Sequence, residues 1–323
     1  MKKVILVGGT PFSGSTVFHM MLANDPKGLA IGEVKSLFLP VLAKHTQPEC
    51  SCEEPNCSFW NRIRKQGADH LYETIFDLCP QVDTIVDSSK FPFWIDRQNK
   101  QLPAKGIQVE NVLIWKTPVE YAASCWKRRE IFPRNWQQWA RDWVDYHRLY
   151  LSLVQNWQGV QYANLAANSA QTLTAVGNYL GLPYFPGKER FWEKPQHVLF
   201  GNRAARGVPK ARNPNTEEQK STTRATLPAS VEETIQHEAA FVRLQKVLLQ
   251  CDILRNDLSP LHGKDNDLHP TSNHTSNSVV NGTANGANSL QAQRLSWPMV
   301  EYRRLRAATL TTIGHYRYGK NLP

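Results

Sequence analysis

The sequence lacks any long apolar run, because none approaches the length of about 20 residues that crosses a bilayer. This absence excludes a protein built on membrane-spanning helices. The chain also lacks a secretory signal, since the apolar part of residues 1–9 stops after Val7 and no small-residue cleavage site follows. Six cysteines in 323 residues are too few for a disulfide scaffold. We therefore expect a cytoplasmic protein that folds around an apolar core.

Acidic residues are also scarce, because 28 Asp and Glu stand against 38 Lys and Arg, a net charge of +10. This balance favours an anionic partner: nucleic acid, a membrane surface, or a phosphorylated or sulfated small molecule. Half of the excess lies in residues 290–323, which hold six basic residues and one acid. The charge therefore says little about the rest of the chain. We predict a small-molecule partner and no nucleic acid.

Hydrophobic periodicity predicts strands that alternate with helices. The alternation is typical of an α/β fold, in which helices cover both faces of a parallel sheet. The predicted strands are residues 4–9, 84–86, 109–115 and 160–162, and the predicted helices are 15–24, 118–129 and 170–180.

Composition divides the chain into three parts. Residues 1–259 hold the predicted strands and helices and form the expected domain. Residues 260–296 are rich in Asn, Ser, Thr and Gly and contain no Phe, Tyr or Trp, which predicts a flexible linker. Residues 297–323 are a basic tail with aromatic residues. The tail could dock on its own domain or on a partner, and contact with an anionic membrane surface is a less favoured alternative.

The first predicted strand leads into a glycine-containing loop at residues 9–16, Gly-Thr-Pro-Phe-Ser-Gly-Ser-Thr. A strand, loop and helix in this order turn backbone N–H groups toward a phosphate-type anion. The position of the Walker lysine, however, holds Ser15. An NTPase uses that lysine on its β- and γ-phosphates, so the loop favours a phosphate-type anion without triphosphate hydrolysis. A simple turn between strand and helix is the alternative.

The loop is similar to the phosphosulfate loop of sulfotransferases, which use 3′-phosphoadenosine-5′-phosphosulfate (PAPS). Further motifs of the family follow in the same order over much of the first 206 residues. The sequence resembles bacterial sulfotransferases, with similarity to tyrosylprotein and carbohydrate sulfotransferases. It implies a P-loop NTPase-like parallel sheet flanked by helices, the sulfotransferase fold. The segments that resemble the family are residues 31–33 (Ile-Gly-Glu), 87–90 (Asp-Ser-Ser-Lys), 115–124, 162–165, 180–184 and 197–203.

The resemblance also implies roles for individual residues. Glu33 would be the general base and Lys90 the cation at the transferring group; a helix-capping or Lys35-paired glutamate and a surface lysine are the alternatives. Lys116 and Ser124, eight residues apart, would hold the 3′-phosphate. Independently of the resemblance, Arg206 lies in a basic stretch that is a solvated loop by default and that could also form a lid from which Arg206 reaches the cofactor. No metal is required for the transfer. The residues expected around the 5′-phosphate are Pro11, Phe12, Ser13, Gly14, Ser15 and Thr16.

The sequence departs from the family pattern at two positions. Phe12 stands where many members carry Lys or Arg, and Lys116 stands where Arg is usual, which keeps the charge and loses the bidentate fork. We predict a PAPS-dependent sulfotransferase that acts on a hydroxyl of a carbohydrate or another small molecule. The alternatives are a nucleotide-dependent kinase, which Ser15 disfavours, and a non-catalytic protein that binds PAPS or its product, which Phe12 suggests.

Two further patterns do not enter the predicted transfer reaction. Cys50, Cys52 and Cys57, with His45 upstream, could bind zinc, but the spacing differs from that of zinc fingers, and a cysteine pair or loop packing is the favoured reading. Aromatic residues recur every three or four positions from Trp136 to Trp157, which predicts one helix face packed in the core.

Overall fold

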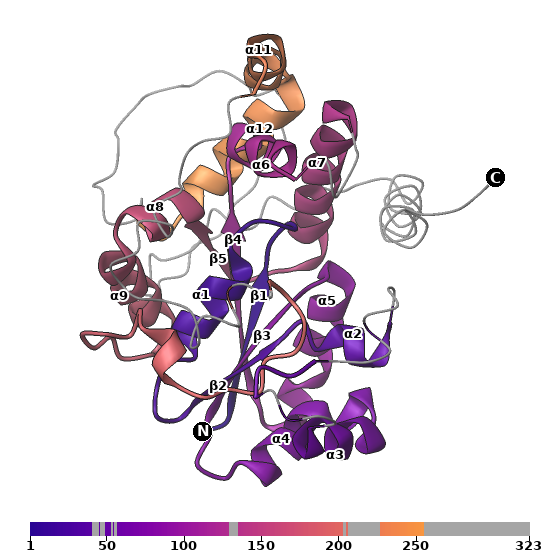
Figure 1. Cartoon of the computed structure of the whole chain (residues 1–323), viewed down its shortest axis with the longest axis vertical. Helices are drawn as coiled ribbons and strands as arrows, with labels where there is room; N and C mark the ends of the chain where they lie inside the picture. The colour runs from indigo at the N-terminus through magenta and orange to yellow at the C-terminus, as the bar shows by residue number, and fades with distance from the viewer. Residues whose placement is uncertain are drawn as a thin grey trace, which may run out of the picture.

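The computed structural model describes residues 1–40, 45, 49–52, 54, 57–128, 135–202, 205 and 227–254. Its centre is a five-stranded sheet in the order β2-β3-β1-β4-β5, with every neighbouring pair parallel (Figure 1). The predicted α/β class is therefore confirmed. The strands are β1 (Lys3–Gly8), β2 (Gly28–Gly32), β3 (Thr84–Lys90), β4 (Gln108–Trp115) and β5 (Trp157–Gln161).

Helices cover both faces of the sheet because successive strand side chains point to opposite sides. In β1, Ile5 and Val7 join the core beneath α1 (Ser15–Leu22) and α9 (Ser169–Leu180), whereas Val4 and Leu6 join the opposite core. The opposite core is closed by α3 (Ser58–Gln66), α4 (Leu71–Leu78), α5 (Pro92–Gln101), α7 (Trp136–Leu153), α11 (Ala229–His237) and α12 (Ala239–Gln250). The remaining α-helices are α2 (Lys35–Phe38), α6 (Pro118–Trp126) and α8 (Tyr162–Ala167).

The observed boundaries differ from several of the predicted ones: α1 ends at Leu22 rather than at residue 24, and α6 ends at Trp126 rather than at residue 129. Strand β3 runs on to Lys90, so the Asp-Ser-Ser-Lys segment is strand rather than loop. Strand β5 starts at Trp157 and ends before Tyr162, which begins α8. Strand β2 was not predicted, because its five residues begin and end with glycine and carry only three apolar side chains. Its burial within the sheet, rather than a local pattern, makes it a strand.

The aromatic periodicity after residue 135 belongs to α7, as predicted, but the helix ends at Leu153 and Trp157 lies in β5. Trp139, Trp143 and Tyr150 are buried, so the prediction that this face is core is confirmed for them.

Across the described part of the chain, no helix is both long enough and apolar enough to span a bilayer. Residues 260–296 and 297–323, predicted as linker and tail, lie outside the described residues, as does Arg206.

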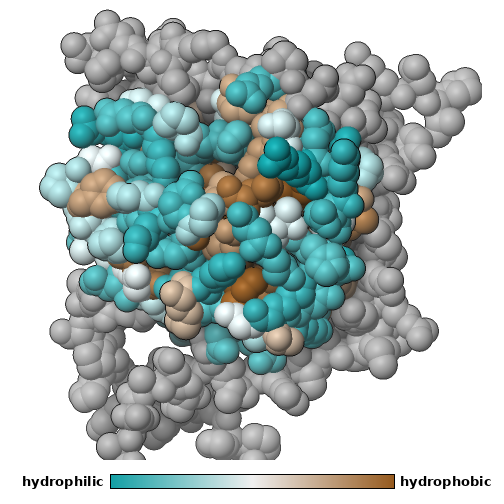
Figure 2. All heavy atoms as spheres, turned by 90° about the horizontal axis from the view of Figure 1, so that it is seen from below, coloured by the Kyte–Doolittle hydropathy of each residue, from teal (hydrophilic) through white to brown (hydrophobic). Residues whose placement is uncertain are grey.

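A hollow of about 550 Å³ lies where the strands begin, lined by residues that include Met1, Lys3 and Thr84. Figure 2 shows the molecule from below, relative to the view of Figure 1. The face seen there is largely hydrophilic, with small separate apolar patches. In open α/β sheets, ligands bind outside the carboxyl ends of the strands. The predicted site residues that the structure describes lie at that opposite edge, away from the hollow.

Candidate functional site

The loop between β1 and α1 holds the predicted phosphate-binding residues. Gly14 precedes the first turn of α1 with φ of 94°, a left-handed conformation that favours glycine. A Cβ at Gly14 would also collide with the ring of Tyr162. The first N–H groups of a helix have no intrahelical acceptor, and the first turn of α1 contains no acidic residue. This helix end is therefore suited to an anion.

Two hydroxyl groups in the same loop indicate whether the loop could bind a phosphate-type group. The Thr10 and Ser13 side chains are buried, and neither hydroxyl has a hydrogen-bond partner among the described residues. Buried polar groups are nearly always paired, so orphaned hydroxyls are unusual. A loop that keeps unpaired donors beside a helix N-terminus fits an anionic ligand.

Two residues at the carboxyl ends of the strands, one in the loop after β1 and one at the end of β3, adopt backbone conformations that cost energy. Phe12 has φ of 66° and Lys90 has φ of 63°, and neither is glycine. Such conformations cost about 1–3 kcal/mol each and are concentrated at functional sites. Their occurrence in the phosphate-type loop and at the end of β3 marks this edge as the candidate site.

Tyr146, on α7, connects these two strained segments. Its hydroxyl accepts a hydrogen bond from the Gly9 N–H at 2.6 Å and donates one to the Lys90 carbonyl at 2.6 Å. Burial raises the pKa of Tyr146, so the hydroxyl remains a donor at neutral pH. Sequence reasoning placed Tyr146 with the core aromatics and missed this role, since no local signal distinguishes it from its neighbours on the helix.

We expect Tyr146→Phe to lower the free energy of unfolding by about 1–3 kcal/mol, because it removes the hydrogen bonds to the Gly9 N–H and the Lys90 carbonyl. Affinity for adenosine 3′,5′-bisphosphate should fall as well, since the loop and Lys90 lose their common anchor. Thermal unfolding and calorimetry check both effects. Tyr179→Phe, at a tyrosine that is 37% exposed, is the control. Unchanged stability and affinity in Tyr146→Phe would contradict this role.

Glu33 and Lys90 come from the ends of neighbouring strands and form an ion pair, with 2.5 Å between Lys90 Nζ and Glu33 Oε1. Their side chains are 24% and 17% exposed, so a ligand can reach both. Gly32 has φ of 76°, and a Cβ there would collide with the Leu199 carbonyl, which accepts a hydrogen bond from the Glu33 N–H at 2.9 Å. Lys35, the alternative partner for Glu33, lies over the ring of Phe91 at 4.4 Å, and its charge also interacts with that of Glu33.

Asp87 anchors the strand that carries Lys90. Its buried carboxylate accepts hydrogen bonds from Tyr72 Oη at 2.7 Å, Trp94 Nε1 at 3.0 Å and the Ser89 N–H at 2.7 Å. Burial raises the pKa of Asp87, and these hydrogen bonds oppose the shift. Asp87 therefore has a structural role in the Asp-Ser-Ser-Lys segment.

His19, on α1, is fully buried close to Glu33 and Lys90. Burial lowers its pKa from 6.5 to about 4, so its ring is neutral at physiological pH. Nδ1 lies 3.0 Å from the Ser15 carbonyl, which can only accept, so we place the proton on Nδ1. A ring with no exposed surface cannot contact an acceptor substrate directly.

Lys116 and Ser124, predicted as a pair from their spacing, are in contact. Lys116 Nζ donates to Ser124 Oγ at 3.1 Å, and Ser124 Oγ donates to the Glu120 carbonyl at 2.8 Å. Thr117 caps α6 together with Glu120 in a reciprocal capping box, which fixes the turn between β4 and the helix. The Lys116 ammonium also lies 4.2 Å from the centre of the Tyr162 ring. Burial lowers the pKa of Lys116 from 10.5 to about 8.

The shifted pKa of Lys116 predicts that binding of adenosine 3′,5′-bisphosphate depends on pH. The protonated ammonium is the form that attracts phosphate, so affinity should be highest below the Lys116 pKa. It should then fall by up to about tenfold per pH unit as the pH rises through about 8. Calorimetry between about pH 7 and about pH 9, above the ionisation of phosphate monoesters, measures the slope. Lys116→Arg should flatten it, because arginine stays protonated; equal slopes would contradict the assignment.

Arg128 lies beside Phe12 and was missed by sequence reasoning. Its guanidinium is 4.7 Å from the centre of the Phe12 ring, and its Nη1 donates to the Ser124 carbonyl at 3.0 Å. Arg128 also helps to lower the pKa of Lys116, although burial is the larger cause. Arg128, two residues after the end of α6, therefore places a cation beside Phe12 of the loop.

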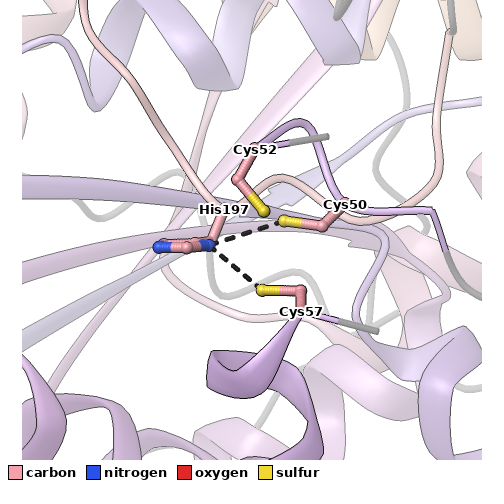
Figure 3. Close-up of side chains that lie close together, drawn as sticks. All are labelled: Cys50, Cys52, Cys57 and His197. Atoms are coloured by element: carbon pink, nitrogen blue, oxygen red, sulfur yellow. Dashed lines mark hydrogen bonds between the residues drawn. The ribbon is translucent and has the colours of Figure 1, made fainter. Parts of the chain in front are cut away.

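The cysteine-rich segment forms a separate cluster with one histidine, which is His197 rather than His45. Cys50, Cys52, Cys57 and His197 point toward one another (Figure 3), and their Sγ and Nδ1 atoms all lie within 4.8 Å of each other. His45 instead packs edge-on against Phe200, with 4.9 Å between ring centres. Sequence reasoning missed His197 as a cluster member because about 140 residues separate it from Cys57.

No protein-family model and no curated protein matches the chain. Solved structures that are similar to it include the following three. The sulfotransferase domain from the curacin biosynthetic pathway is 14% identical, with a TM-score of 0.50 over 77% of this chain and 98% of that one. The corresponding domain of the Synechococcus PCC 7002 olefin synthase is 16% identical, with a TM-score of 0.49 over 76% and 94%. A sulfotransferase from Alicyclobacillus acidocaldarius is 12% identical, with a TM-score of 0.39 over 75% and 99%.

A sequence identity of 14% supports a likeness of fold alone, and the curacin-pathway domain shows it with a TM-score of 0.50. The five-stranded parallel sheet with helices on both faces agrees with this similarity. The chain has the α/β fold of sulfotransferase domains.

Proposed function

We propose that this protein transfers a sulfuryl group from PAPS to a hydroxyl group of a carbohydrate or another small molecule. The observation that carries the proposal is the set of groups found where β1, β2, β3 and β4 end: the loop at residues 9–14, the Glu33–Lys90 ion pair and the Lys116–Ser124 pair. An anion-binding loop, a carboxylate and separate cations are the groups that this transfer needs.

The 5′-phosphate and the 3′-phosphate of PAPS would be held by different residues at the carboxyl ends of the strands. Residues 11–16 would surround the 5′-phosphate with backbone N–H groups, and the Ser13 hydroxyl, which has no hydrogen-bond partner among the described residues, would be free to turn toward it. Lys116 and Ser124 would hold the 3′-phosphate, and Arg128 would add charge near the loop. When bound, PAPS supplies an activated sulfuryl group attached to its 5′-phosphate. Arg206, outside the described residues, remains a proposed lid contact.

Glu33 would accept the proton of the attacking hydroxyl, and Lys90 would stabilise negative charge near the sulfuryl oxygens. Their ion pair keeps the two groups together at the ends of adjacent strands. An incoming anion would compete with Glu33 for the Lys90 ammonium, which leaves the carboxylate free to accept a proton.

The proposal is tested by incubating the full chain with PAPS and a broad panel of hydroxyl-bearing acceptors. Mass spectrometry of each acceptor should show the gain of one sulfuryl group. Parallel reactions with ATP and Mg²⁺ should show no phosphoryl transfer. Binding of adenosine 3′,5′-bisphosphate without transfer to any acceptor would instead favour a non-catalytic binding protein.

A further inference from the structure

The cluster of Cys50, Cys52, Cys57 and His197 lies outside the machinery proposed for sulfuryl transfer. Two separate segments build it. Cys50 and Cys52 lie in the stretch after α2, Cys57 precedes the first residue of α3, and His197 lies on the segment before Leu199. Three thiols and one imidazole thus converge from positions that only the tertiary fold brings together (Figure 3).

Two sulfur–nitrogen distances in the cluster match those of a tetrahedral metal site. Zinc binds thiolate sulfur at about 2.3 Å and imidazole nitrogen at about 2.0–2.1 Å, so sulfur and nitrogen ligands of one ion lie about 3.6 Å apart. The Sγ atoms of Cys50 and Cys57 each lie 3.5 Å from His197 Nδ1. One ion could therefore contact both thiols and the imidazole with little movement of the ligands.

A disulfide explains this cluster less well. It would join two cysteines at an S–S distance of about 2.05 Å and would leave the third thiol and the imidazole without a function. All three cysteines are free in the structure. Four convergent ligands are the number that a structural zinc site uses.

Contacts around the cluster hold its ligands in orientation. The His197 ring stacks on Phe59 with 4.5 Å between ring centres. The backbone carbonyl of His197 accepts a hydrogen bond from Trp60 Nε1 at 3.0 Å. Ser51 joins the two segments: its N–H donates to the Val198 carbonyl at 3.0 Å, and its hydroxyl accepts from the Val198 N–H at 2.9 Å. Such supporting contacts orient the ligands of metal sites.

We propose that Cys50, Cys52, Cys57 and His197 bind one Zn²⁺ ion in a closed, structural Cys₃His site. Soft thiolates with one imidazole in tetrahedral spacing favour zinc over hard cations such as Mg²⁺ and Ca²⁺. Four protein ligands leave no open position for a substrate, which distinguishes the site from catalytic zinc.

The zinc ion would hold in place the segment of His197 and Leu199, which contacts the backbone of Glu33. Leu199, two residues after His197, pairs with Gly32 on one side and with Cys50 on the other, and its carbonyl accepts from the Glu33 N–H. A crosslink at His197 would therefore hold the segment that fixes the Glu33 backbone. The metal site does not depend on the proposed activity, since zinc can be measured without any turnover.

The first test measures metal in the full chain, purified without chelator. Mass-spectrometric metal analysis should find about one zinc per chain. Replacement of zinc by Co²⁺ should give the intense visible bands of tetrahedral cobalt and a thiolate-to-cobalt charge-transfer band. Less than about 0.2 zinc per chain together with the absence of these bands would overturn the proposal. A disulfide between any two of the three cysteines, found by non-reducing peptide mapping, would also overturn it.

The second test compares variants. Cys57→Ser and His197→Asn should each reduce bound zinc by at least about fivefold and lower the melting temperature, because each removes a ligand. Cys79→Ser and Cys251→Ser, at free cysteines outside the cluster, should retain zinc. Full zinc content in either ligand variant would contradict the assignment. If the ligand variants do not fold, titration of wild-type protein with a thiol-reactive mercurial still counts the zinc released as the thiols react.

Discussion

Glu33→Gln should lower turnover of PAPS with an acceptor by about 10²–10⁴-fold, because an amide keeps the shape of the side chain and cannot accept a proton. Glu33 is the accessible carboxylate at the carboxyl end of β2, paired with Lys90. Affinity for adenosine 3′,5′-bisphosphate should stay within about twofold, since none of the groups assigned to its phosphates is changed. Single-turnover kinetics and calorimetry measure the two quantities separately.

Glu110→Gln is the matched control, because Glu110 lies on β4, toward the opposite edge of the sheet from its carboxyl end. It should leave turnover unchanged. Wild-type turnover in Glu33→Gln would show that another residue is the base. His19 would then be tested next, although its burial and low pKa argue against direct contact with an acceptor.

Adenosine 3′,5′-bisphosphate should bind more than about tenfold more tightly than AMP, because charge-assisted hydrogen bonds contribute about 1.5–3 kcal/mol each. The groups assigned to the 3′-phosphate, Lys116 Nζ and Ser124 Oγ, already lie 3.1 Å apart and need little reorganisation. Calorimetry with both nucleotides measures the preference. Equal affinities would contradict the assignment of this pair.

Lys116→Ala should reduce that preference and leave AMP binding nearly unchanged, since AMP lacks the phosphate that Lys116 would contact. Lys65→Ala, at an exposed lysine on α3, is the control and should keep the preference. An equal loss of affinity for both nucleotides in Lys116→Ala would indicate a general electrostatic effect rather than a 3′-phosphate site.

Several features of the site follow from the sequence because they are local. The Gly-Thr-Pro-Phe-Ser-Gly-Ser-Thr loop is built within eight residues, and Gly14 takes the positive φ that its position predicts. Lys116 and Ser124 are eight residues apart on one strand–helix turn, so their contact follows from chain geometry. The residues at the ends of predicted parallel strands could likewise be expected at one edge of the sheet.

The tertiary structure alone decided the contacts between distant segments. Tyr146 reaches Gly9 across 137 residues, and Arg128 reaches the ring of Phe12 from beyond α6. The sequence pointed to His45 as the fourth member of the cysteine cluster because it is near, whereas packing brings His197 there.

Sequence by itself therefore determined the α/β class, the anion-suited loop and the charged pair after β4, because periodicity and short spacing act through neighbouring residues. The partner of Glu33, the anchor of the loop and the ligand set of the proposed zinc site depend on which segments pack against one another. Long-range packing follows from burial of the whole core, and no local pattern encodes which distant side chain it will bring into a site.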